Sequence, residues 1–98
     1  MNPLRVQISG DSMWPTYPDG TQFDLDEDFE DYLKVNDVVL ALHPHSKGLK
    51  IVKRIQSVKG DWIFLVGDNP DPLSSDDSHN FGAVHLDNIL GICIPIVN

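Results

Sequence analysis

Two residues of this chain have the types and settings that nucleophilic catalysis requires. Ser12 follows Gly10 at the end of a strand-like run, and Pro15 restricts the chain after it, so the hydroxyl can project from a turn. Lys53 lies in Ile51–Ile55, where strand alternation places it on one face with two isoleucines. Because burial lowers the pKa of a lysine, Lys53 could act as a neutral base. It would take the Ser12 proton at hydrogen-bond reach, about 2.6–3.2 Å.

Both residues also have a purely structural interpretation. A serine in a Gly-x-Ser turn commonly shapes the turn, and a lysine among apolar neighbours can extend its amine to solvent. The four histidines are rival bases, and no spacing selects the carboxylate that would orient one of them in a Ser–His–Asp triad. The candidate carboxylates are Asp11, Asp68 and Asp77. A metal site of His43, His45 and Cys93 matches no zinc-type spacing, so we expect no metal and no cofactor.

The elements that must position these residues are mostly strands. Leu4–Ile8 alternates apolar and polar residues, as a strand half exposed to solvent does. Four more strand-like runs follow, at Asp37–Leu42, Leu49–Ile55, Asp61–Val66 and Ile89–Ile94. The first of these four is apolar throughout, as in a strand buried on both faces, and Gly91 is a candidate bulge in the last. We predict a single domain over residues 1–98 with a mostly β fold, a small antiparallel barrel or sandwich.

Three segments are predicted to lie outside the strands. Helical turns are expected near Asp28–Tyr32 and near Leu86–Ile89. Much of the acid of the chain lies in Asp24–Asp31, which we interpret as a solvated connector. A docking site for a basic peptide is the alternative interpretation of that acidic segment.

Composition limits the classes of function. The 98 residues carry fifteen acids and seven bases, a net charge of −8, so the surface repels phosphate backbones and no nucleic acid is expected as a partner. One cysteine, Cys93, cannot form an internal disulfide, and its isoleucine neighbours predict burial. The longest apolar stretch, Ile89–Val97, is shorter than the about 20 residues of a membrane-spanning helix. We expect a soluble, cytoplasmic protein without a membrane span.

Three motifs occur in an order typical of one peptidase family. The first is Ser12–Thr16, which reads Ser-Met-Trp-Pro-Thr, and the second is Lys53–Arg54. The third is Gly67–Asn69, followed by Ser75–His79. In order and spacing the chain resembles the bacterial type I signal peptidase family over most of its length. The resemblance implies a serine endopeptidase with the β fold of the signal peptidase catalytic core and a Ser/Lys dyad.

The resemblance also implies a role for individual residues. Ser12 would be the nucleophile, with its backbone N–H in the oxyanion hole, and Lys53 would be the general base. Ser75 would orient the lysine amine, and Asp77 would brace the loop that holds Ser75. Arg54 would be a supporting residue of the base motif.

Gly10 and Met13 lie near the expected nucleophile and are expected to contact substrate. Two positions, Gly10 and His79, depart from the family pattern. Gly10 stands where some members supply a serine hydroxyl to the oxyanion hole, so a second oxyanion donor has no assignment. His79 replaces the arginine that usually follows Asp-Ser, so its expected ion pair with Asp77 becomes sensitive to pH.

Within this group, the chain most resembles the small nickel-type superoxide dismutase maturation proteases. The shared features are short length, His43–Pro44, Val52–Arg54 and Gly67–Pro70. This likeness implies a preprotein partner, the nickel-type superoxide dismutase precursor, whose N-terminal leader is removed. The alternatives are a signal peptidase-like protease of another substrate, a self-cleaving repressor-type peptidase and a non-catalytic peptide-binding module. A substrate is expected to add as an extended strand beside Val6–Gly10.

Overall fold

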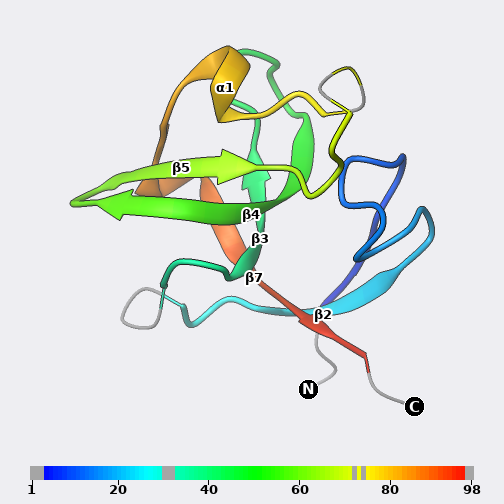
Figure 1. Ribbon diagram of the computed structural model, residues 1–98. Helices are drawn as coiled ribbons and strands as arrows, with labels where there is room; N and C mark the ends of the chain where they lie inside the picture. The colour runs from blue at the N-terminus through cyan, green and yellow to red at the C-terminus, as the bar shows by residue number, and fades with distance from the viewer. Residues whose placement is uncertain (1–3, 30–32, 72, 74, 97–98) are drawn as a thin grey trace.

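The computed structural model describes residues 4–29, 33–71, 73 and 75–96. Within these residues, seven strands form one antiparallel sheet in the order β1-β2-β7-β3-β4-β5-β6, which curls into a half-barrel (Figure 1). The strands are β1 (Leu4–Gln7), β2 (Gln22–Asp26), β3 (Val38–Leu42), β4 (Lys50–Lys59), β5 (Trp62–Val66), β6 (Val84–His85) and β7 (Ile89–Pro95). The predicted mostly β, antiparallel fold class is therefore confirmed.

Two short helical turns complete the described elements. A 3₁₀ turn spans Leu86–Asn88, close to the predicted helical turn near residues 86–89. A four-residue helix, α1 (Ser78–Phe81), lies beside β5 and was not predicted. Its first turn is capped by the Asp77 carboxylate. The other predicted turn, near residues 28–32, begins with irregular backbone at Asp28 and Phe29, and its last three residues lie outside the described residues.

The acidic segment differs from its predicted role as a solvated connector. Residues Gln22–Asp26 form β2, which lies between β1 and β7 in the sheet. Phe23 is fully buried and Leu25 is half-buried, while Asp24 and Asp26 lie on the other face. The alternation of two apolar with three polar residues in this short run is a strand pattern, hidden by the high local charge.

Two apolar clusters lie on opposite faces of β3, because successive side chains of a strand alternate. The first cluster contains Phe29, Val39, Ala41, Ile55, Ile63, Leu65, Val84 and Ile89. The second contains Ile8, Met13, Phe23, Val38, Leu40 and Cys93. As predicted, β3 is buried on both faces. Burial raises the pKa of the Cys93 thiol to about 12, so this cysteine behaves as a small apolar residue.

A bulge interrupts the pairing of β7 with β3 next to Gly91. Leu40 pairs with Gly91 and Ala41 pairs with Ile89, so Leu90 is left without a partner on β3. The absence of a side chain at Gly91 also lets β2 approach. A Cβ there would lie 2.6 Å from Leu25 Cδ1 and 2.8 Å from a backbone carbonyl of β2.

We predict that Gly91→Ala lowers the free energy of unfolding by about 1–3 kcal/mol, the usual effect of overpacking. The contact with a backbone carbonyl cannot be relieved unless β2 moves away from β7. Gly48→Ala is the control, because a Cβ at Gly48 meets nothing within 4 Å and its effect comes from the φ of 80° alone. Urea denaturation measures both variants. A Gly91→Ala protein as stable as the parent would contradict this account of the contact.

Candidate active site

Ser12 lies in a compact turn that follows β1. The turn opens at Gly10, whose φ of 94° suits glycine and whose N–H donates to Asp19 Oδ1 at 2.7 Å. The next side chain after Ser12, that of Met13, is 0% exposed and packs in the second cluster beside Phe23. The buried Met13 side chain therefore anchors the turn to the second cluster, and contact of Met13 with substrate stays a prediction.

Lys53 is buried on the face of β4 that carries the first apolar cluster. It pairs with Val39 of β3 and lies between Ile51 and Ile55 along its own face. Only 5% of the residue is exposed. Burial lowers the pKa of Lys53 from its ordinary value, and the charges of Asp77 and Asp76 oppose that shift in part.

Ser12 and Lys53 line the same cleft. The cleft has a volume of about 500 Å³, and its walls come from Arg5–Ser9 and from Leu49–Lys53, with Leu40 between them. No hydrogen bond joins Ser12 Oγ to Lys53 Nζ within the part of the chain that the structure describes. Gly10, which was expected to contact substrate, does not belong to the lining.

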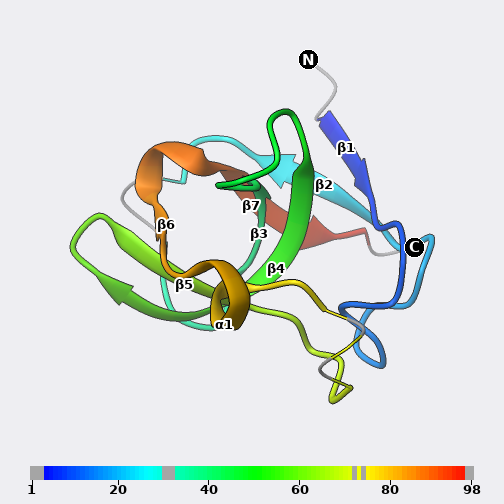
Figure 2. The ribbon, with the colours of Figure 1, turned by 90° about the horizontal axis from the view of Figure 1, so that it is seen from above.

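Both walls of this cleft have strand edges without a partner strand among the described residues. β1 is the first strand of the sheet order, so one of its edges is free. β5 pairs with β4 only from Arg54 onward, which leaves one edge of Lys50–Lys53 free. β1 and the first half of β4 are neighbours in Figure 2. An extended peptide could therefore pair its backbone with either wall.

Gly67, the first residue of the third motif, packs directly against the turn that contains Ser12. A Cβ at Gly67 would lie 2.7 Å from the Ser12 carbonyl oxygen and 2.9 Å from Ser75 Cβ. Glycine is thus the residue that allows the segment after β5 to touch both the turn and Ser75. The contact is visible in both ribbon views, where the blue turn and the yellow-green segment after β5 are side by side (Figures 1 and 2).

An ion pair between Arg54 and Asp68 connects β4 to the segment after β5. Arg54 donates to both oxygens of Asp68, from Nε at 2.9 Å and from Nη2 at 2.7 Å, and its Nη1 donates to the Asn36 carbonyl at 2.8 Å. The hydrogen bond from Arg54 holds the pKa of Asp68 below its ordinary value, and a hydrogen bond from Thr16 adds to this effect. Asp68 therefore binds Arg54 and Thr16, which lies in the turn of Ser12, and does not orient a histidine.

The sequence matches the family model described as Peptidase S24-like over residues 4–85 of 98. The chain belongs to the Peptidase S24-like family. Membership indicates a serine-peptidase-like function and agrees with the predicted type of fold. None of the curated proteins compared with the chain matches it. Among the described residues, no helix is both long enough and apolar enough to cross a membrane.

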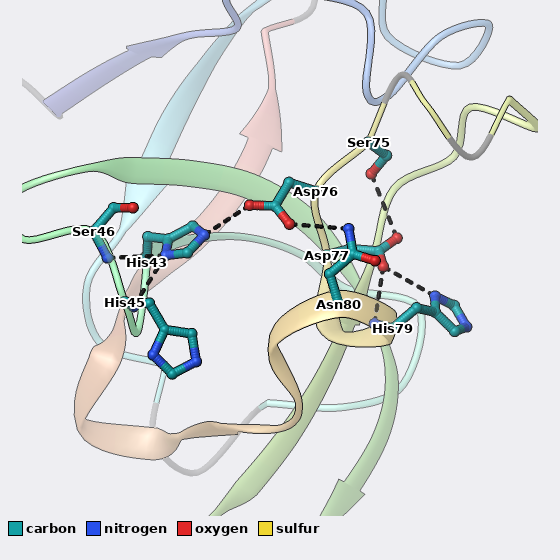
Figure 3. A network of polar contacts seen from close by, with 8 residues as sticks. All are labelled: His43, His45, Ser46, Ser75, Asp76, Asp77, His79 and Asn80. Atoms are coloured by element: carbon teal, nitrogen blue, oxygen red, sulfur yellow. Dashed lines mark hydrogen bonds and ion pairs between the residues drawn. The ribbon is translucent and has the colours of Figure 1, made fainter.

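In this Peptidase S24-like chain, Asp77 organises the loop before α1 (Figure 3). Its Oδ1 accepts from the His79 backbone N–H at 3.0 Å and contacts His79 Nδ1 at 2.9 Å. Its Oδ2 accepts from the Gly67 N–H at 3.1 Å and from Ser75 Oγ at 3.4 Å. Burial raises the pKa of Asp77, but these hydrogen bonds outweigh burial and leave the pKa below its ordinary value. Ser75 lies next to Asp77 and outside the lining of the Ser12 cleft.

The histidines of this Peptidase S24-like chain occupy other positions. His43, whose side chain is 6% exposed, contacts Asp76 Oδ2 through Nε2 at 2.8 Å (Figure 3). Its Nδ1 accepts the backbone N–H groups of His45 at 3.0 Å and Ser46 at 3.1 Å. Both ring nitrogens are therefore engaged, and within the described residues no histidine lines the cleft of Ser12. Sequence reasoning missed this pair, since His43 and Asp76 are distant along the chain and share no motif.

We predict that Asp76→Asn lowers the pKa of Lys53 further. The Asp76 carboxylate favours the lysine ammonium and so raises its pKa against the effect of burial. Removal of that charge leaves burial less opposed, and the amine loses its proton at a lower pH. An NMR titration of the lysine side-chain carbons measures the shift. Asp61→Asn, at an exposed position on the β4–β5 turn, is the control and should leave the titration unchanged. An upward shift in Asp76→Asn would contradict the assignment.

Proposed function

We propose that this protein is a serine endopeptidase in which Ser12 is the nucleophile and Lys53 is the general base. The observation that carries the proposal is the position of Lys53. Its amine is buried on an apolar face, yet the residue also forms the wall of the cleft that contains Ser12. Burial of a lysine costs stability, and Lys53 has no ion-pair partner among the described residues, so a catalytic role accounts for its position.

The proposed reaction begins when the neutral Lys53 amine takes the proton of the Ser12 hydroxyl. Ser12 Oγ attacks the carbonyl carbon of the scissile peptide, and the negative oxygen that forms is stabilised by the Ser12 backbone N–H. The Lys53 ammonium then gives its proton to the leaving amine. The Lys53 amine, now neutral again, activates the water that hydrolyses the acyl-enzyme. The lowered pKa of Lys53 supports this role, since a base must be unprotonated to begin the cycle.

The absence of a hydrogen bond between Ser12 and Lys53 among the described residues is compatible with this mechanism. Catalytic hydrogen bonds are often long before substrate binds and tighten in the complex. In the proposed complex, the substrate lies as an extended strand between the free edges of β1 and Lys50–Lys53. Such a strand would carry its scissile carbonyl to the end of β1, next to the Ser12 turn.

At the level of substrate, we propose that the enzyme removes the N-terminal leader of a preprotein, the nickel-type superoxide dismutase precursor. Support for this finer proposal comes from the shared sequence features, including His43–Pro44 and Gly67–Pro70. Incubation with that precursor, followed by intact-mass analysis, tests it. A shortened product with a new N-terminus supports the proposal. An unchanged precursor, together with cleavage of other peptides, would assign a different substrate.

We predict that Ser12→Ala and Lys53→Met each reduce kcat/KM for peptide cleavage by about 10³-fold or more. Ser57→Ala and Lys59→Met are matched controls, because both residues lie on β4 outside the lining of the cleft. Lys53→Met should also be more stable than the parent below the folded-state pKa of Lys53. The difference should shrink as the pH rises from that lowered pKa to the ordinary value of 10.5, where the amine is neutral in the unfolded chain as well and folding no longer requires loss of a proton. Equal turnover by Lys53→Met and the parent would exclude lysine as the base.

We predict that kcat/KM rises with pH through the lowered pKa of Lys53 and levels off above it. A histidine base would instead give a rise near pH ~6.5. The measurement is a pH–rate profile for the parent and for separate His→Gln variants at positions 43, 45, 79 and 85. Each variant should keep the main rise. A folded but inactive His→Gln variant would overturn the Ser/Lys mechanism.

A further inference from the structure

Asn69 holds both peptide groups that flank Ser12. Its backbone N–H donates to the Ser12 carbonyl at 2.9 Å, and its side-chain Nδ2 donates to the Asp11 carbonyl at 2.8 Å. The orientation of the Asn69 amide is fixed in turn, because Oδ1 accepts the Asp71 N–H at 2.8 Å. Two neighbouring carbonyls are thus fixed by one residue, 57 positions downstream of Ser12 (69 − 12).

These hydrogen bonds also decide where the Ser12 N–H points. In a trans peptide the C=O and the N–H point in opposite directions, and the described cis bond of this chain lies elsewhere, at Trp14-Pro15. The Asp11 carbonyl shares its peptide with the Ser12 N–H. Because Asn69 draws that carbonyl to itself, the Ser12 N–H points away from Asn69. Within the described residues the Ser12 N–H has no hydrogen-bond acceptor.

An N–H without an acceptor next to a candidate nucleophile is suited to receive a negative oxygen. We infer that Asn69 is a positioning residue, which fixes the peptide on the N-terminal side of Ser12 so that its N–H is directed at the developing oxyanion. The inference rests on the proposed function. Asn69 touches neither the substrate nor Lys53 in this role, and it acts only through the backbone of Ser12. Gly67 contributes by allowing the segment of Asn69 to approach the Ser12 carbonyl.

The test uses Asn69→Asp, which keeps the shape of the side chain but replaces the Nδ2 donor with an oxygen. That oxygen would face the Asp11 carbonyl and repel it, so the peptide would lose its fixed orientation. We expect kcat to fall about 10- to 100-fold, part of the about 10²–10³-fold loss known for removal of a whole oxyanion donor. KM should stay within about threefold, since the ground-state carbonyl gains little from the donor. Asn88→Asp, with the same change of charge on a half-buried asparagine, is the control and should keep its kcat.

Two further readouts separate positioning from a general structural effect. The pH at which kcat/KM rises should not move in Asn69→Asp, because the base is untouched. The inhibition constant of a peptide aldehyde should rise in proportion to the loss in kcat, because its adduct with Ser12 Oγ places an oxyanion at the same N–H. A shifted pH profile, a KM that rises as much as kcat falls, or an unchanged kcat would each overturn the inference.

The outcomes also distinguish this inference from the proposed function. If the parent is active and Asn69→Asp has the same kcat, only the role of Asn69 is overturned. If the parent neither cleaves peptides nor binds the aldehyde at Ser12, the proposed function is overturned together with the inference. If Asn69→Asp does not fold, the parent itself gives the answer by NMR, because aldehyde binding should shift the Ser12 amide proton strongly downfield. An unmoved Ser12 amide signal in the aldehyde complex would overturn the inference.

Discussion

The burial of one lysine amine is the constraint on which the rest of this structure depends. Lys53 occupies a position on β4 where an apolar side chain would pack without cost, between Ile51 and Ile55 and opposite Val39. The surroundings are therefore arranged to lower its pKa without leaving it wholly isolated from charge. Asp76 and Asp77 lie close enough to act on it through their fields, but neither forms an ion pair with it among the described residues. A full ion pair would favour the charged amine and would work against the proposed role of Lys53 as a base.

Two tertiary connections hold the Ser12 turn close to β4. The ion pair of Arg54 with Asp68 joins the residue next to Lys53 to the segment after β5, and Thr16 extends the connection to the Ser12 turn. Gly67 and Asn69 provide the second connection, through close packing and through hydrogen bonds to the turn. Strand β4 thus presents the proposed base, Lys53, on one face and Arg54, which forms the ion pair with Asp68, on the other.

The two free strand edges explain how so small a chain can offer a peptide site. Unpaired edges favour aggregation, and natural proteins usually keep them short or charged. Here β1 has four residues, and the cleft beside it carries Arg5 and Lys50 within an otherwise acidic protein. The free edges are therefore short, and the charge on them limits pairing between copies while leaving backbone groups available to an extended peptide.

The sequence alone determined those features that depend on local periodicity. Alternation of side chains along a strand placed Lys53 among isoleucines, the apolar run Val38–Leu42 predicted burial on both faces, and Gly91 marked a bulge. The tertiary structure alone decided which distant groups meet. These contacts join segments that are distant along the chain, so no periodic pattern in the sequence predicts them. They are the partners of His43 and Asp68, the burial of Met13 in the second cluster and the hydrogen bonds of Asn69. Strand β2 shows the same limit, since packing of Phe23 and Leu25 against the sheet outweighed the charge that predicted a connector.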